Sequence, residues 1–117
     1  MEKMTGLKHL LKAFKDSCQG LKSAFKSEAA FRHDLIIFVV GVLISFFLPL
    51  SGFERALMVF SLFLILLMEL VNTAIEVIID RISTQYNPLS KKAKDIGSSL
   101  VFLAFIDAIL VWGLILF

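Results

Sequence analysis

Residues 69–80 read ELVNTAIEVIID, a segment in which three carboxylates and an amide interrupt an apolar run. At about 100° per residue, Glu69, Asn72, Glu76 and Asp80 fall on one narrow stripe of a helix, and apolar side chains cover the remaining surface. An ionisable side chain inside a membrane costs about 2.5 to 3.5 kcal/mol on insertion scales, so this stripe requires either partners or a function. We take a function as the working hypothesis.

The composition is that of an integral membrane protein. Hydrophobic residues make up 58% of the 117 residues and the mean hydropathy is +0.87, whereas soluble proteins contain about 45 to 50% apolar residues. The single cysteine, Cys18, excludes an intrachain disulfide and metal sites built from cysteine pairs. The net charge is only +2, so the positions of the charges are more informative than their sum.

Three apolar segments approach or exceed the length that crosses a membrane. We expect transmembrane helices at 34–50, 53–81 and 96–117, within a single membrane domain that covers residues 1–117. The polar stretch at 82–95 is the expected connection between the last two, with Ser90 or Asp95 as the N-terminal cap of the third. The predicted fold class is all-α integral membrane protein.

Residues 1–33 carry a helical period instead of a continuous apolar run. Leucine, phenylalanine and cysteine recur every three or four residues from Leu7 to Phe25, and lysines occupy the other positions. This pattern predicts a basic amphipathic helix on a membrane surface, and its apolar face argues against nucleic-acid binding. Gly20 interrupts the period, so one helix and two helices around a break fit equally well.

Lysine and arginine are distributed unevenly around the expected spans. Seven of them, from Lys3 to Arg32, precede the first span, Arg55 alone lies in the first connection, and four lie in the second. By the positive-inside rule, the N-terminus and the second connection are cytoplasmic and the C-terminus is outside.

The acidic stripe therefore enters the membrane from the cytoplasmic side. At 1.5 Å per residue, Glu76 lies about 6 Å and Glu69 about 16 Å deeper than Asp80. Glu28 precedes the first span at a similar level, so Glu28 and Glu76 can meet and provide hard oxygen ligands for Mg²⁺. Lys94, just before the third span, adds a cation suited to phosphate.

A metal site, a phosphate-binding lysine and a deeper carboxylate that accepts a proton are recurring parts of phosphoryl transfer. The six glycines are scattered, and no glycine-rich phosphate loop of the known kinase or nucleotide-binding types is present. From the residues alone, a catalytic carboxylate cluster and an ion or proton pathway therefore explain the stripe equally well.

The motifs, in this order, closely resemble those of the bacterial integral-membrane diacylglycerol kinases. The resemblance implies homotrimers of three-span subunits in the bacterial cytoplasmic (inner) membrane, with active sites shared between neighbouring subunits. It also implies transfer of the ATP γ-phosphate to the primary hydroxyl of diacylglycerol, which gives phosphatidic acid. The matching motifs are Gly20-Leu21-Lys22, Glu28-Ala29-Ala30-Phe31-Arg32, Glu69, Asn72-Thr73-Ala74-Ile75-Glu76, Asp80-Arg81, Ala93-Lys94-Asp95, Gly97-Ser98 and Trp112.

The resemblance further implies roles for individual residues. Glu69 would be the general base, Asn72 and Asp80 would complete the catalytic site, and Glu28 and Glu76 would hold Mg²⁺ with ATP. The implied nucleotide contacts are Asp16, Glu28, Glu76, Gln85, Tyr86, Asn87, Lys94 and Asp95. The implied substrate contacts are His9, Ser17, Ala30, Arg32, Asp34, Glu69, Ser98 and Trp112.

The chain departs from the pattern of the better-known relatives at several positions. His9 stands where they have arginine, Asp16 where they have tyrosine, and Gln85-Tyr86-Asn87 where they carry a Glu-Tyr-His run. Asp107 lies in mid-span where an apolar residue is usual, and either a polar contact between helices or a water-lined position explains it.

Two other functions are alternatives to diacylglycerol phosphorylation. Undecaprenol kinase belongs to the same superfamily and uses the same core motif, although the stretch at 28–32 and the Asp80-Arg81 pair are more similar to the diacylglycerol group. An ion- or proton-conducting or purely structural membrane oligomer is the non-enzymatic alternative, and it predicts no ATP turnover and tolerance of Lys94→Ala.

Overall fold

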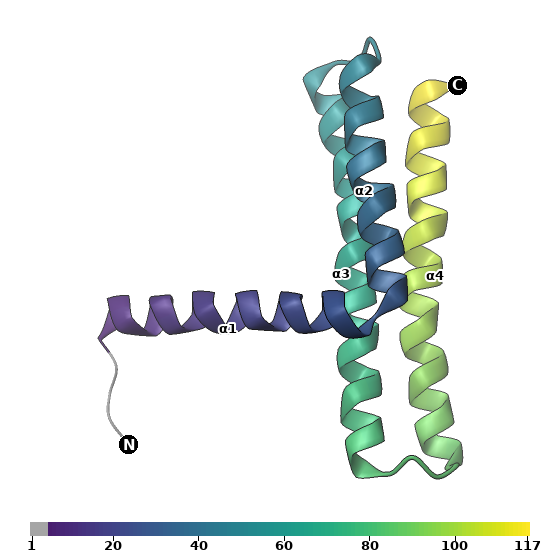
Figure 1. Ribbon diagram of the computed structural model, residues 1–117. Coiled ribbons are helices and arrows are strands. Elements are labelled where there is room, and N and C mark those ends of the chain that lie inside the picture. Colours follow the sequence, from purple (N-terminus) through teal and green to yellow (C-terminus); the bar gives the residue numbers. More distant parts are fainter. Residues whose placement is uncertain (1–4) are drawn as a thin grey trace.

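A computed structural model of the protein describes residues 5–117, which form four helices. Helix α1 lies crosswise to an upright bundle of the other three (Figure 1). Lys3, one of the basic residues used for orientation, lies outside the described residues. The helices are α1 (Gly6–Ser27), α2 (Ala29–Phe47), α3 (Gly52–Ile82) and α4 (Pro88–Leu116).

Three of the helices, α2, α3 and α4, are long and apolar enough to cross a membrane. Their number and order confirm the predicted all-α class with three apolar spans. Much of their outer surface is apolar and exposed within the single chain, for example Ile36 at 61%, Leu43 at 56% and Ile109 at 70%. Such surfaces suit lipid tails or another copy of the chain, since neither environment competes for hydrogen bonds.

The N-terminal segment differs from the prediction in its boundaries. Helix α1 runs through Gly20 without a break, which decides between the one-helix and two-helix alternatives. It ends at Ser27, and α2 begins at Ala29 instead of residue 34. Glu28 is the single extended residue between the two helices, with φ −115° and ψ 106°.

Helix α4 begins earlier than predicted. The Asn87 side-chain oxygen accepts hydrogen bonds from the backbone N–H groups of Leu89, at 2.8 Å, and Ser90, at 3.4 Å, and Pro88 occupies the first turn. Asn87, and neither Ser90 nor Asp95, is therefore the cap, which is a correction of the prediction. An asparagine cap followed by proline is a favourable helix start, because proline lacks the N–H that would be unpaired there.

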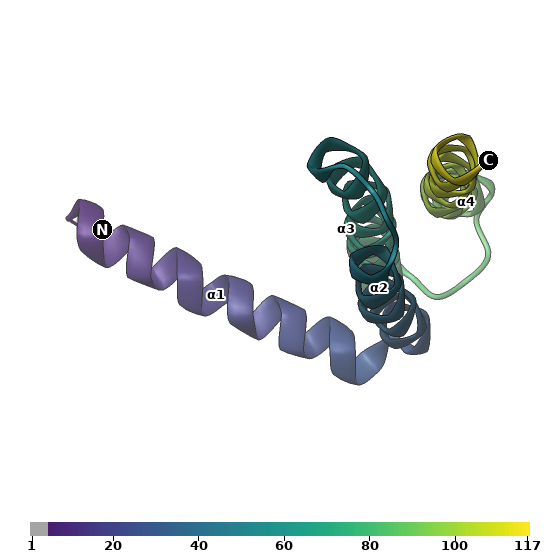
Figure 2. The same ribbon diagram turned by 90° about the horizontal axis from the view of Figure 1, so that it is seen from above.

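Helix α3 packs along both α2 and α4, whereas α2 and α4 have little contact with each other. In the view from above, α4 stands apart from α2 (Figure 2). Small residues allow α4 to approach α3 closely: Ala104 and Ala108 pack against Leu62 and Ile65 in the bundle core. The bundle is thus open on the side between α2 and α4.

Candidate active site

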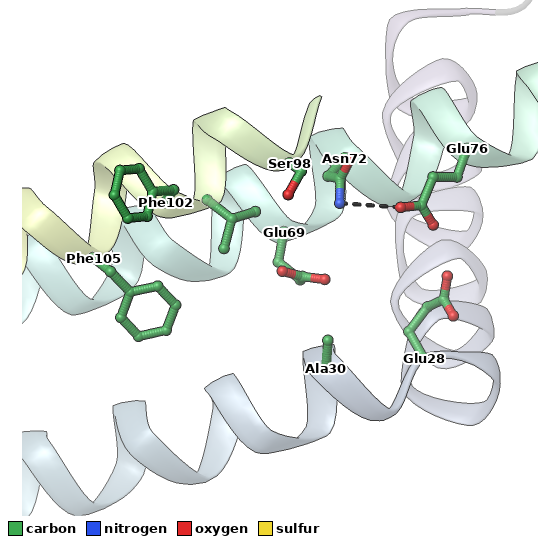
Figure 3. A pocket seen from close by; sticks show the side chains of 9 residues that line it. Glu28, Ala30, Glu69, Asn72, Glu76, Ser98, Phe102 and Phe105 are labelled. Carbon is green, nitrogen blue, oxygen red and sulfur yellow. Dashed lines mark hydrogen bonds between the residues drawn. The ribbon is translucent and has the colours of Figure 1, made fainter. Parts of the chain in front are cut away.

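The acidic stripe of α3 opens into a pocket of about 450 Å³ on this open side of the bundle, which we call the carboxylate pocket (Figure 3). Its residues come from the α1–α2 junction, from α2, from α3 and from α4. They are Glu28, Ala30, Glu69, Asn72, Glu76, Ser98, Val101, Phe102 and Phe105.

The stripe residues differ in burial along the pocket. Glu69 is 7% exposed and Asn72 is 9% exposed, whereas Glu76 is half-buried. Because one helical turn separates neighbouring stripe positions, the carboxylates lie at successive depths. The structure thus brings together three of the four stripe residues; the fourth, Asp80, is exposed and does not line the pocket.

Asn72 lies where the stripe packs against Gly97 of α4. Its side-chain amide nitrogen donates a hydrogen bond to Glu76 Oε1 at 3.2 Å. Its Oδ1 is buried and, among residues 5–117, has no hydrogen-bond partner. Gly97 faces this oxygen so closely that a Cβ there would lie 2.5 Å from Oδ1. A buried acceptor without a partner is costly, and this one is packed against Gly97 of α4.

Glu28 reaches the pocket from the break between two helices. Glu28 is the C-cap of α1 and also the N-cap of α2. Its backbone N–H donates to Ala24 O at 2.9 Å. Its carboxylate and that of Glu76 point toward one another across the pocket (Figure 3). The predicted meeting of these two carboxylates at the membrane boundary is therefore consistent with their positions.

Two predicted substrate contacts of α2 lie just outside the pocket lining. Asp34 is 7% exposed, and its carboxyl group lies beside that of Glu69. Arg32 does not line the pocket; its Nη1 donates to the backbone oxygens of Phe25, at 2.7 Å, and Lys26, at 3.1 Å.

Most predicted nucleotide contacts gather in a second pocket of about 410 Å³ at the α3–α4 connection, which we call the loop pocket. Lys94 Nζ is held by Asp80 Oδ1 at 2.8 Å, and a second lysine, Lys91, pairs with Asp95 at 2.6 Å. Both ion pairs are largely exposed to solvent. The predicted nucleotide residues in this lining are Gln85, Tyr86, Asn87, Lys94 and Asp95.

The predicted contacts on α1 lie elsewhere. Asp16 is exposed and pairs with Lys12 at 2.7 Å, and His9 is exposed near the start of the helix. Ser17 lines a mainly apolar groove between α1 and α3 and donates its hydroxyl to Ala13 O at 2.8 Å. None of the three lines the carboxylate pocket or the loop pocket.

Trp112 lies at the other end of the bundle. Its indole N–H donates to Met58 O at 3.1 Å, and its ring borders an apolar groove beside Gly41. The hydrogen bond ties α4 to α3 some distance from the carboxylates.

Three pocket residues were not among the predicted site residues. Val101, Phe102 and Phe105 form the apolar wall on α4. They follow Ser98 at the spacings i+3, i+4 and i+7, which place residues on one face of a helix. Because Ser98 was a predicted site residue, this helical spacing could have predicted that the three residues line the same pocket.

Fold and site together define a membrane protein with a carboxylate pocket at the end of a three-helix bundle. A family model described as prokaryotic diacylglycerol kinase matches residues 15–116. A diacylglycerol kinase of Haemophilus influenzae is 47% identical over 117 residues, 100% of this chain and 99% of that one. Those of Pseudomonas aeruginosa and Escherichia coli K12 are 45% and 38% identical over 96% of this chain and 91% and 92% of theirs.

The chain therefore belongs to the prokaryotic diacylglycerol kinase family. It is a lipid kinase with a membrane setting, as the sequence resemblance indicated.

Proposed function

We propose that the protein transfers the γ-phosphate of ATP to the primary hydroxyl of diacylglycerol, which gives phosphatidic acid and ADP. The observation that carries this proposal is the composition of the carboxylate pocket. Glu69 lies buried beside the apolar wall of α4, and Glu28 and Glu76 lie at the junction with α1. The carboxylate pocket thus offers a proton acceptor beside the apolar wall. It also offers two carboxylates as metal ligands near the junction with α1.

In this proposal Glu69 is the general base. It accepts the proton of the lipid hydroxyl as the hydroxyl oxygen forms its bond to the γ-phosphorus and the bond to the β–γ bridging oxygen breaks. Asn72 helps to orient the site through its amide nitrogen, which donates to Glu76 Oε1 at 3.2 Å. Holding the hydroxyl close to the base replaces a bimolecular encounter with a positioned one.

Mg²⁺ fits the residues at the outer end of the pocket. Mg²⁺ typically uses one or two protein carboxylates together with substrate phosphates, and Glu28 and Glu76 face each other there (Figure 3). Among residues 5–117, no group of three or more histidine, cysteine or acidic side chains gathers as a metal site, so phosphate oxygens would complete the shell. When bound, the ion would neutralise charge on the phosphates.

Lys94 and the loop pocket are the proposed contacts for the nucleotide. Lys94 precedes Ser98 by one turn of α4, and Asp80 follows Glu76 by one turn of α3, so their ion pair lies one turn away from the carboxylate pocket. A phosphate oxygen can replace the Asp80 carboxylate as the partner of Lys94, because both are anionic acceptors. Tyr86, 78% exposed, offers an aromatic face for a base.

The proposed setting is the bacterial inner membrane, with the N-terminus and the α3–α4 connection in the cytoplasm, where ATP is available. Helix α1 would lie on the membrane surface with its apolar side down, since Leu7, Leu11 and Phe14 are 59 to 69% exposed within the chain. We also propose a homotrimer with shared sites, because the open side of the bundle leaves the carboxylate pocket uncovered.

The test is phosphate transfer from labelled ATP by purified protein in mixed micelles with Mg²⁺, with diacylglycerol and undecaprenol offered separately. We expect phosphatidic acid to be the preferred product. A preference for the polyprenol would show that undecaprenol, and not diacylglycerol, is the substrate. Labelling of neither lipid by folded protein would overturn the kinase proposal.

Glu69→Gln tests the general base within the same assay. We expect turnover to fall at least 100-fold, the low end of the contribution of general acid–base catalysis, with the oligomer and its melting temperature unchanged. Glu54→Gln is the matched control, because Glu54 lies in the capping box with Ser51 at the far end of α3 and glutamine serves equally well there. Wild-type turnover by Glu69→Gln would exclude this role.

A further inference from the structure

Arg32 bridges the junction between α1 and α2. It lies on the first turn of α2, and its Nη1 donates to the carbonyl oxygens of Phe25 and Lys26 at 2.7 Å and 3.1 Å. These carbonyls belong to the last turn of α1, where the helix leaves its oxygens without partners. A guanidinium there satisfies two acceptors and also complements the negative end of the helix dipole.

The residue enclosed by this bridge is Glu28. The chain turns sharply at Glu28, and the junction contains neither glycine nor proline, so no local backbone preference explains the turn. The remaining bonds at the junction are the backbone contacts Glu28 N to Ala24 O, at 2.9 Å, and Arg32 N to Glu28 O, at 3.3 Å. Ala24 of α1 and Phe31 of α2 also pack together against Leu66 of α3. Among residues 5–117, the Arg32 side chain adds the hydrogen bonds that join the first turn of α2 to the last turn of α1.

We propose that Arg32 is a positioning residue: by binding the last carbonyls of α1 it fixes the α1–α2 angle and thereby aims the Glu28 carboxylate at Glu76. This inference rests on the proposed function of Glu28 as a ligand of Mg²⁺-ATP. It differs from the role that sequence resemblance implies for Arg32, which is contact with the lipid substrate. Nη1 of the guanidinium is occupied by the two α1 carbonyls, and Arg32 does not line the carboxylate pocket.

The two roles predict different kinetics for Arg32→Met. If Arg32 positions Glu28, the KM for Mg²⁺-ATP rises about tenfold, as expected for loss of charge-assisted hydrogen bonds, and the KM for diacylglycerol stays within twofold. If Arg32 instead contacts the lipid substrate, the KM for diacylglycerol rises and the KM for Mg²⁺-ATP stays within twofold. Arg32→Lys keeps one charged donor and is expected to restore part of the affinity for Mg²⁺-ATP. Lys26→Met is the matched control, since it removes a neighbouring cation but leaves the carbonyl that Arg32 binds, and we expect less than a twofold change.

A double-mutant comparison with Glu28→Gln tests the proposed connection between the two residues. If Arg32 acts through Glu28, adding Arg32→Met to Glu28→Gln raises the KM for Mg²⁺-ATP by less than twofold further, because coupled residues are not additive. A full additional tenfold rise would overturn the proposal.

A structural measurement separates this inference from the proposed function. Cys18 is exposed on α1 and is the single cysteine of the chain, so a nitroxide attached there reports the mobility and membrane depth of α1. We expect Arg32→Met, but not Lys26→Met, to change both signals. If the label changes and Glu28→Gln leaves the KM for Mg²⁺-ATP unaltered, the proposed role of Glu28 fails and the junction role stands. An unchanged label would overturn the junction role itself.

Discussion

Asn72 depends on the absence of a side chain at Gly97. Gly97→Ala would place a Cβ 2.5 Å from Asn72 Oδ1 and 3.4 Å from Ile75 Cδ1, and the short Asn72 side chain cannot move away without turning. We expect the Asn72–Glu76 hydrogen bond to break and phosphatidic acid formation to fall about tenfold or more, in line with the loss of one hydrogen bond to a charged group. Steady-state turnover in mixed micelles measures this.

Gly113→Ala is the control for this substitution. Gly113 lies on the same helix, and a Cβ there meets nothing within 4 Å in the chain. Turnover and melting temperature are expected to match the wild type, and alanine is a better helix former than glycine. Equal losses of activity in both variants would show that helix α4 tolerates no added methyl group. The loss in Gly97→Ala would then not be due to Asn72.

At this scale the sequence predicted the stripe on α3 and named Glu28, Ala30 and Ser98 from other elements, but it did not predict the contact between Asn72 and Gly97. Glu69, Asn72 and Glu76 share a face because of helical periodicity, which is local. The close approach of Gly97 to Asn72 depends on how α4 is rotated against α3. Rotation is set by packing of side chains such as Ala104 and Ala108, which no single-segment pattern contains.

At the scale of the elements, an arginine binds the C-terminal carbonyls of a helix at each end of α2. Arg32 binds those of α1, and Arg55 binds those of α2 through Nε to Ser45 O, at 3.0 Å, and Nη2 to Leu48 O, at 3.1 Å. The Arg55 guanidinium also lies 5.3 Å from the centre of the Phe46 ring. Arg55 thus holds the short α2–α3 turn together with the capping box of Ser51 and Glu54.

Arg55→Met should lower the free energy of unfolding by about 2 kcal/mol, because hydrogen bonding by a charged group contributes about 1.5 to 3 kcal/mol and the two bonds share one guanidinium. Activity of the folded fraction should stay at the wild-type level, since the turn is at the far end of α3 from the carboxylate pocket. Thermal unfolding in detergent measures the loss of stability. Arg81→Met, at an exposed position, is the control. Equal stability of the two variants would show that the Arg55 contacts contribute nothing.

Trp112→Phe distinguishes a structural from a substrate-binding role for this indole. Loss of the hydrogen bond to Met58 O should reduce stability by about 1 kcal/mol, while Met58 O keeps the Ser61 hydroxyl at 2.7 Å. The KM for diacylglycerol should stay unchanged because Trp112 does not line the carboxylate pocket. A raised KM with unaltered stability would instead support the substrate contact that sequence resemblance implies.

Helix boundaries show where sequence signals end. Asn87 and Pro88 are a recognisable start signal, and the early start of α4 could have been predicted from them. The break at Glu28 has no such signal, because the Arg32 side chain that bridges it binds carbonyls six and seven residues away, and no local motif encodes these bonds. The number of spans was predictable, since it depends only on the length and hydropathy of each segment.

At the scale of the whole molecule, the carboxylate pocket is incomplete in one chain. Helices α2 and α4 leave the bundle open between them, and Phe102, which lines the pocket, is 65% exposed. A pocket that positions a phosphate against a base functions best when water is excluded. A neighbouring subunit that covers this side would complete it, as the proposed homotrimer with shared sites requires.

Mixed oligomers test this sharing. Glu69→Gln and Lys94→Ala subunits should each be inactive alone, because each lacks one proposed part of the phosphoryl-transfer site. If Glu69 of one subunit works with Lys94 of its neighbour, random trimers from equal amounts of the two restore about one quarter of wild-type activity, since a site needs both subunits in the right order. If both residues act within one chain, every site carries a defect and the mixture stays inactive. The measurement is turnover after co-refolding, with each variant refolded alone as the control.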